Sequence, residues 1–202
     1  MSRIRRLGVA AIMTAAMLVG GAPAFATEPL TTSGHVTDPD GFLRDEQRAA
    51  ITSRAESFNT AYDTTIDVVI IPNFSDQEPS AWCEATLTQS RTIERGILYV
   101  VAYEDGTDVY CTDAKLAHSM QTDTSIRTEF GTAMGAARSR YTSTPVTPER
   151  TAAGTEAFID NLRGSFDFRA EQAARYRKSQ RELEESKKKA EESNRTGLLV
   201  GV

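Results

Sequence analysis

Acidic side chains gather in short turn-like segments, and they are the residues of this chain best suited to chemistry. Residues 38–41 read Asp-Pro-Asp-Gly and residues 104–107 read Glu-Asp-Gly-Thr. Carboxylate oxygens are the ligands that Ca²⁺ and Mg²⁺ prefer, and such a cation can polarise a phosphoryl group and acidify a bound water. We therefore take four carboxylates as candidate metal ligands, with a purely structural role in turns as the alternative: Asp38, Asp40, Glu104 and Asp105. Three more are candidates for the substrate-facing rim of the same site: Asp76, Asp108 and Asp113.

The chain offers little other material for catalysis. Its two histidines, His35 and His118, lie far apart in the sequence. It has no Gly-x-Ser-x-Gly elbow, glycine-rich phosphate loop or His-Glu-x-x-His motif. No catalytic residue is assigned, and any enzymatic activity would depend on the carboxylates and Ca²⁺ or Mg²⁺, with no other cofactor expected.

Two runs of apolar, largely β-branched residues define the elements that must position these side chains. Residues 66–71 and 97–103 are typical of strands buried on both faces. Apolar spacing and a Pro-Ser start predict helices over about residues 45–62 and 79–95. A strand that follows each helix implies parallel strands with right-handed crossovers, and the Asp-Gly turn adds an antiparallel strand over 108–112.

The sequence thus predicts an α/β fold. We expect an αβα sandwich with a mostly parallel sheet of about four strands, an antiparallel edge hairpin and helices on both faces. Further helices are expected after residue 114 and over 149–162. The loops beyond the carboxyl ends of parallel strands form the crevice where such sheets bind ligands, so the acidic segments should meet at one rim.

The two cysteines lie on core-facing elements, Cys83 on the second helix and Cys111 on the return strand of the hairpin. In an exported chain a disulfide between them would stabilise the fold by roughly 3 kcal/mol. The alternative is two buried free thiols.

The first 26 residues have the pattern of an export signal. Arg3, Arg5 and Arg6 precede an apolar stretch that ends in Ala-Phe-Ala at residues 24–26, which predicts cleavage before Thr27. An uncleaved anchor is the alternative. We expect a protein that acts outside the cytoplasm, secreted or anchored, facing the cell envelope.

Charge restricts the partners. The formal net charge is −5, and residues 27–164 carry 21 acidic against 11 basic side chains. This excess of negative charge argues against nucleic acid as a partner. It also repels phosphates unless a cation neutralises part of it. An envelope protein or a cell-wall component is the expected partner.

Composition divides the mature chain into four parts. Residues 27–33 are a polar lead-in, residues 34–164 hold the apolar core, and residues 165–196 are rich in Ala, Glu, Lys and Arg. The third part predicts a solvated helical stalk, because it lacks an apolar stripe wide enough to pack on a core. Residues 197–202 are apolar and could begin a membrane anchor, which would associate the protein with a membrane.

Several segments in order resemble the TPM-domain family, and exported actinobacterial members most of all. They are Val-Thr-Asp-Pro-Asp-Gly-Phe-Leu at 36–43, the strand at 66–72, Gly-Ile-Leu-Tyr-Val-Val-Ala-Tyr-Glu-Asp at 96–105 and Thr-Asp-Ala at 112–114. The resemblance covers about residues 34–163. It implies an αβα sandwich and, for some members, Ca²⁺-assisted acid phosphatase activity, while other members act in binding or assembly.

Two positions depart from the family pattern. Gly106 stands where members often carry Arg, and Cys-Thr-Asp at 111–113 replaces a frequent Gly-x-Gly. A basic residue that could orient phosphate is therefore missing where the family places one. We expect an extracytoplasmic binding or assembly module, with a weak cation-dependent phosphatase as the alternative.

Overall fold

A computed structural model describes residues 28–90, 96–141 and 144–200 of this chain, with side chains up to residue 189. The predicted signal peptide, residues 1–26, lies outside the described residues. Within them the element order is β-α-β-α-β-β-α-α-α.

A four-stranded mixed sheet forms the centre of the domain, as predicted. Its strands are β1 (Val36–Thr37), β2 (Thr65–Ile71), β3 (Gly96–Ala102) and β4 (Thr107–Thr112). They lie in the order β1-β2-β3-β4, with β1, β2 and β3 parallel and β4 antiparallel to β3. All seven residues of β3 are buried, which explains its uninterrupted apolar sequence.

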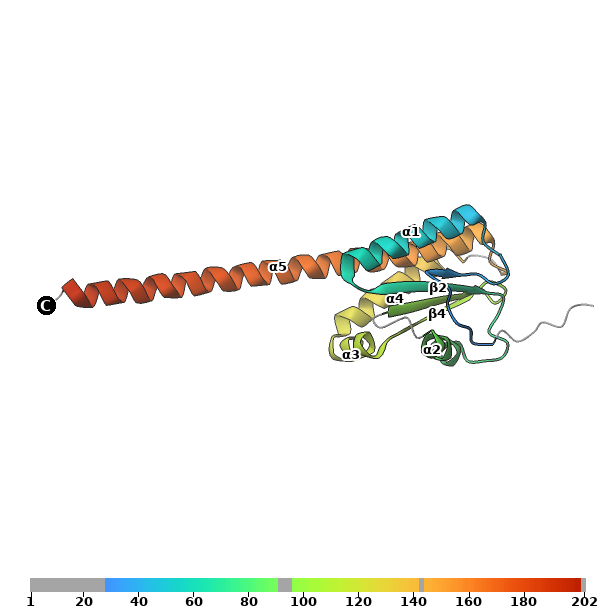
Figure 1. Cartoon of the computed structure of the whole chain (residues 1–202), viewed down its shortest axis with the longest axis horizontal. Helices are drawn as coiled ribbons and strands as arrows, with labels where there is room; N and C mark the ends of the chain where they lie inside the picture. Colours follow the sequence, from blue (N-terminus) through green and yellow to red (C-terminus); the bar gives the residue numbers. More distant parts are fainter. Residues whose placement is uncertain (1–27, 91–95, 142–143, 201–202) are drawn as a thin grey trace, which may run out of the picture.

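Helices cover both faces of this sheet (Figure 1). The elements are α1 (Asp45–Tyr62), α2 (Pro79–Gln89), α3 (Ala114–Thr122), α4 (Thr124–Arg138) and α5 (Pro148–Val200). Side chains of α1, α4 and α5, such as Phe58, Phe130 and Phe158, form one core with the first face. Trp82 and Cys83 of α2 form a second core with the opposite face. The αβα sandwich is thereby confirmed.

The predicted disulfide is present between Cys83 and Cys111, with a Cα–Cα distance of 5.9 Å. It fastens α2 to β4, the edge strand of the sheet. The alternative of two free thiols is wrong.

The C-terminal region differs from the expected pattern of two helices. The structure has one continuous helix, α5, of 53 residues, and Gly164 lies within it without interrupting it. The first turns pack on the domain through Phe158 and Leu162, whereas residues 170–189 are exposed. The exposed part projects away from the domain (Figure 1). In the described parts of the chain, no helix is both long and apolar enough to cross a membrane.

Candidate functional site

The loops after β1, β2 and β3 meet at the carboxyl edge of the parallel strands, as predicted. Two backbone bonds join the loop after β3 to the end of β2 and the start of the loop that follows it: the amide of Tyr103 donates to the carbonyl of Ile71 at 3.0 Å, and the amide of Glu104 donates to the carbonyl of Pro72 at 2.8 Å. We call this edge the rim. It comprises residues 38–43, 72–78 and 103–107.

Asp38 stabilises the loop in which it lies. Its carboxylate accepts the amides of Phe42 at 2.9 Å and Leu43 at 2.8 Å, and Arg48 of α1 donates to it at 3.2 Å. The side chain is fully buried in this arrangement. Its oxygens therefore hold the entry to α1, which is the structural alternative named for this residue.

Tyr103 lies among three of the predicted ligands. Its ring stacks on Phe42 with centroids 3.7 Å apart. Burial raises the pKa of the Tyr103 hydroxyl, and the charges of Asp40, Glu104 and Asp38 raise it further. The charges of all three carboxylates therefore act on this one hydroxyl.

Next to this group, the rim is hollowed into a cavity of about 560 Å³. Asp76 and Asp105 contribute to its wall, together with the following residues: Asn73, Phe74, Ser75, Gln77, Pro79 and Thr107. We call it the rim cavity.

Hydrogen bonds within the loops engage the carboxylates beside the rim cavity. Glu104 accepts the side-chain amide of Asn73 at 2.8 Å, and Asp105 accepts the backbone amide of Phe74 at 3.3 Å. Among the residues that the structure describes, no group of three or more His, Cys, Asp or Glu lies close enough to hold a metal ion. The rim is therefore acidic, but most of its carboxylates accept hydrogen bonds from donors in the surrounding loops.

The structure does not bring Asp108 and Asp113 to the rim. The Asp108 side chain is buried in the core, where it accepts the Tyr99 hydroxyl at 2.7 Å and Arg138 Nε at 2.5 Å. Asp113 caps α3 at the other end of the sheet and accepts the amides of Lys115 and Gly96. Both residues hold elements together, and neither lines the rim cavity.

The two histidines lie away from the rim. His35 Nδ1 lies 3.0 Å from the carbonyl of Ile66 and 3.3 Å from Asp67, at the amino end of β2. Burial raises the pKa of Asp67, while His35 and Thr32 lower it by smaller amounts. His118 is exposed on α3.

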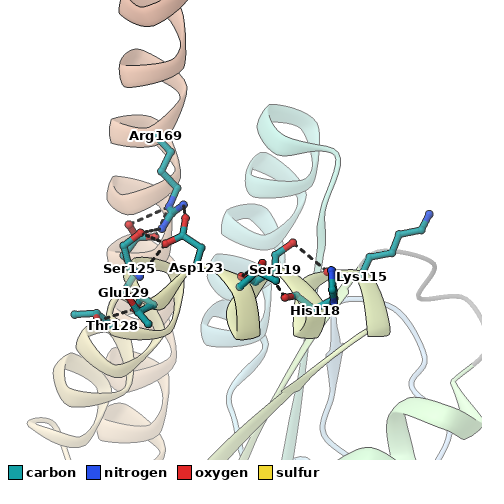
Figure 2. Close-up of polar contacts among 10 residues, drawn as sticks. Lys115, His118, Ser119, Asp123, Ser125, Thr128, Glu129 and Arg169 are labelled. Atoms are coloured by element: carbon teal, nitrogen blue, oxygen red, sulfur yellow. Dashed lines mark hydrogen bonds and ion pairs between the residues drawn. The ribbon is translucent and has the colours of Figure 1, made fainter.

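A second polar cluster fastens the long helix to the domain (Figure 2). Arg169 of α5 donates to Glu129 at 2.7 Å and to Asp123 at 3.1 Å. Asp123 ends α3 and begins α4, where it also accepts the amide of Ser125. Hydrogen bonds from Ser125 and Arg169 lower the pKa of Asp123 to about 2. The cluster has an architectural role at the base of the stalk.

Tyr103 and Phe42 are the rim residues that sequence reasoning missed. A signal was present, because one aromatic residue follows the glycine of the first turn and the other ends an apolar strand. Aromatic residues at such positions are common in cores, so the pattern alone did not separate them from packing residues.

A mixed sheet between helices, with acidic loops gathered beyond its parallel carboxyl ends, defines an α/β sandwich domain with a loop-built rim. Within that class, residues 36–131 match the family model of the TPM domain. The predicted resemblance to the TPM-domain family is thereby confirmed over this segment.

Two curated relatives from Mycobacterium tuberculosis share this segment. They are UPF0603 protein MT2410 of strain CDC 1551 and UPF0603 protein Rv2345 of strain H37Rv. Each is 34% identical over 96 residues, which make up 48% of this chain and 14% of the relative. The chain thus matches only a small part of the relatives' length.

Two solution NMR structures have a similar fold. The N-terminal domain of cg2496 protein from Corynebacterium glutamicum has a TM-score of 0.52 at 18% identity, covering 69% of this chain and 84% of that domain. The N-terminal domain of a protein from P. gingivalis has a TM-score of 0.51 at 16% identity, covering 65% and 83% respectively. At these identities the likeness concerns the fold.

Proposed function

We propose that this protein is an extracytoplasmic module of the bacterial cell envelope that binds another envelope component and takes part in assembly. One observation carries the proposal: three of the rim carboxylates, those of Asp38, Glu104 and Asp105, accept hydrogen bonds from residues of the rim loops. Asp38 holds the entry to α1, and Asp105 holds the loop after β2. A site built in this way offers an acidic surface whose loops are joined by hydrogen bonds, which suits recognition better than bond cleavage.

Three features support the location and partner class. The sequence pattern of residues 1–26 is that of an export signal, and a disulfide such as Cys83–Cys111 persists in oxidising compartments. The negative charge of residues 27–164 favours a partner with basic groups. An envelope protein, or a cell-wall component that carries amines, meets this requirement.

Site-specific photo-crosslinking in cells tests the proposal. A photoreactive residue is placed at Gln77 on the rim, at Ala117 beside β4 and at Glu185 on the exposed part of α5. A binding module gives a discrete adduct from a domain position that a matched substitution at Glu185 does not give. Absence of any discrete adduct from both domain positions would contradict the proposal.

A weak Ca²⁺- or Mg²⁺-dependent acid phosphatase is the alternative function. The specific observation in its favour is the rim cavity, whose wall includes both Asp76 and Asp105. A cation held there would offset the negative field and admit a phosphate. Calorimetric titration with Ca²⁺ separates the proposals: heat of binding that disappears in Asp76→Asn/Asp105→Asn would support the phosphatase, whereas equal traces for both proteins would favour the binding module.

A further inference from the structure

We propose that the free edge of β4 binds an extended, basic polypeptide segment as an additional antiparallel or parallel strand. This inference rests on the proposed binding function and names the surface and the partner chemistry.

The alternation of the β3–β4 pairing determines which backbone groups of β4 face outward. The amide of Asp113 donates to the carbonyl of Gly96 at 3.0 Å, and Leu98 lies opposite Cys111 in the same register. In an antiparallel ladder, hydrogen-bonded and non-hydrogen-bonded pairs alternate. Val109 and Cys111 therefore bond inward to β3.

The backbone groups of the intervening residues, Asp108, Tyr110 and Thr112, point away from the sheet. Arg138 Nη2 donates to the carbonyl of Asp108 at 3.1 Å, as expected for an outward group. Within the described parts of the chain, no hydrogen bond is found for the outward amides and carbonyls of Tyr110 and Thr112. They form an open hydrogen-bonding row for a further strand.

The two edges of the sheet differ in this respect. The β1 edge consists of only two residues. The β4 strand has six residues and contains neither Pro nor Lys, the residues that commonly protect an edge from pairing. The β4 edge is thus longer than the β1 edge and lacks residues that would hinder strand pairing.

A groove of about 580 Å³ runs along the second half of β4. Leu87 and Glu84 of α2 line one wall, and Ala117 and Met120 of α3 line the other. No residue of α3 is fully buried, and its residues Leu116 and Met120 pack against the first core. The groove provides room for the side chains of an added strand.

The negative charge of the domain indicates which kind of segment would bind at the β4 edge. Glu84 is exposed at the groove, and no partner of its carboxylate is found among the described residues. The domain as a whole carries a large excess of acidic residues. A second copy of this chain would bring like charges together, whereas a segment with Lys or Arg next to the edge gains attraction. The partner is therefore an extended basic segment of a protein.

Backbone amide exchange tests this inference on the intact, oxidised mature chain. The probe is a capped heptapeptide, Lys-Val-Lys-Val-Thr-Val-Lys, at millimolar concentration. It should slow the exchange of the outward amides of Tyr110 and Thr112 by about fivefold or more. The inward amides of Val109 and Cys111, already bonded to β3, serve as internal controls and should change less.

Variants of the peptide and of the protein separate edge pairing from simple charge attraction. N-methylation of alternate peptide amides should abolish binding in one of the two possible patterns and spare it in the other. Thr112→Pro removes one outward donor and should weaken binding about fivefold or more, whereas Thr112→Val, which keeps the amide, should not. Glu84→Gln should weaken binding of this peptide.

Several outcomes would overturn the inference without touching the proposed function. Equal binding by both N-methylated peptides would mean that charge alone attracts the probe. No protection of Tyr110 and Thr112, combined with a photo-crosslinked partner at Gln77 but not at Ala117, would mean that the partner sits at the rim. Absence of adducts at both positions would count against the proposed function itself.

Discussion

At the scale of single residues, the acidic side chains of the rim differ sharply in burial and in partners. Asp38 is fully buried and bonded to two amides and Arg48, whereas Asp40, two positions later, is exposed. Buried acceptors that satisfy several donors are costly to remove, because each donor is left without water or partner. Exposed carboxylates carry no such cost.

Asp38→Ala should therefore lower the free energy of unfolding by roughly 3 kcal/mol or more, since it breaks a buried, multiply bonded charge. Asp40→Ala should stay within about 0.5 kcal/mol of the unaltered chain. Urea unfolding with and without Ca²⁺ measures both. A loss in Asp38→Ala that appears only when Ca²⁺ is present would show that the residue acts through a cation instead.

The disulfide gives a second prediction at this scale. Cys83 and Cys111 are 28 residues apart, and opening a loop of that size should cost about 3–4 kcal/mol. Cys83→Ser/Cys111→Ser should show this loss in urea unfolding, and reducing agent should have no further effect on the double variant. A double variant as stable as the oxidised protein would contradict the prediction.

At the scale of elements, one arginine joins three helices. Arg169 of α5 contacts Asp123 and Glu129 at the junction of α3 and α4 (Figure 2). Asp123 has a pKa lowered to about 2 from an ordinary value of 3.8. A carboxylate with a lowered pKa stabilises the fold above its ordinary pKa, and this contribution is lost as the pH falls through the lowered value.

Stability should accordingly decline between about pH 4 and pH 2, in part through protonation of Asp123. Asp123→Asn retains a capping oxygen but cannot lose a charge, so its unfolding free energy should depend less on pH in this window. Unfolding curves at several pH values compare it with the unaltered chain. Parallel pH profiles for the two proteins would exclude this role of Asp123.

The same elements show how far the sequence could predict the structure. The runs at residues 66–71 and 97–103 predicted β2 and β3 because β-branched residues fit buried strands. The break between α3 and α4 was missed, although Asp123 before Thr124 and Ser125 is a recognisable capping signal.

The site was less predictable than the fold, for a physical reason. Topology brought Asp38, Asp40 and Glu104 to one edge as expected. Residue type, however, does not tell which carboxylates accept hydrogen bonds from the loops around them. The burial of Asp108 depends on Arg138, thirty positions away, and no local pattern encodes such a contact. The continuous α5 was missed because Gly164 lowers helix propensity, while packing of the preceding turns on the domain compensates.

At the scale of the whole molecule, a sandwich domain carries a long projecting helix (Figure 1). Tyr176 and Leu183 are 67% and 48% exposed, and the ion pairs Arg175–Glu171 and Lys178–Glu182 lie within the helix itself. The stability of the domain should thus be independent of this part of α5.

Glu182→Pro should interrupt the distal helix, because proline removes an amide and clashes with the preceding turn. Far-ultraviolet circular dichroism should show lost helix, while the thermal midpoint of the domain stays unchanged. Phe158→Ala, in the packed part of the same helix, should instead cost about 3–5 kcal/mol. A lowered midpoint in Glu182→Pro would mean that the stalk contacts the domain.

Turnover of p-nitrophenyl phosphate by the mature chain is the measurement that bears most directly on the proposed binding role. Rates are compared with Ca²⁺, with Mg²⁺ and with a chelator, for the unaltered chain and for Asp76→Asn/Asp105→Asn. If the domain recognises a partner and its rim carboxylates mainly accept hydrogen bonds from the rim loops, the unaltered chain should show the same rate as the double variant under all three conditions. A cation-dependent rate that the double variant loses, and that Ser186→Ala on the stalk keeps, would contradict this account.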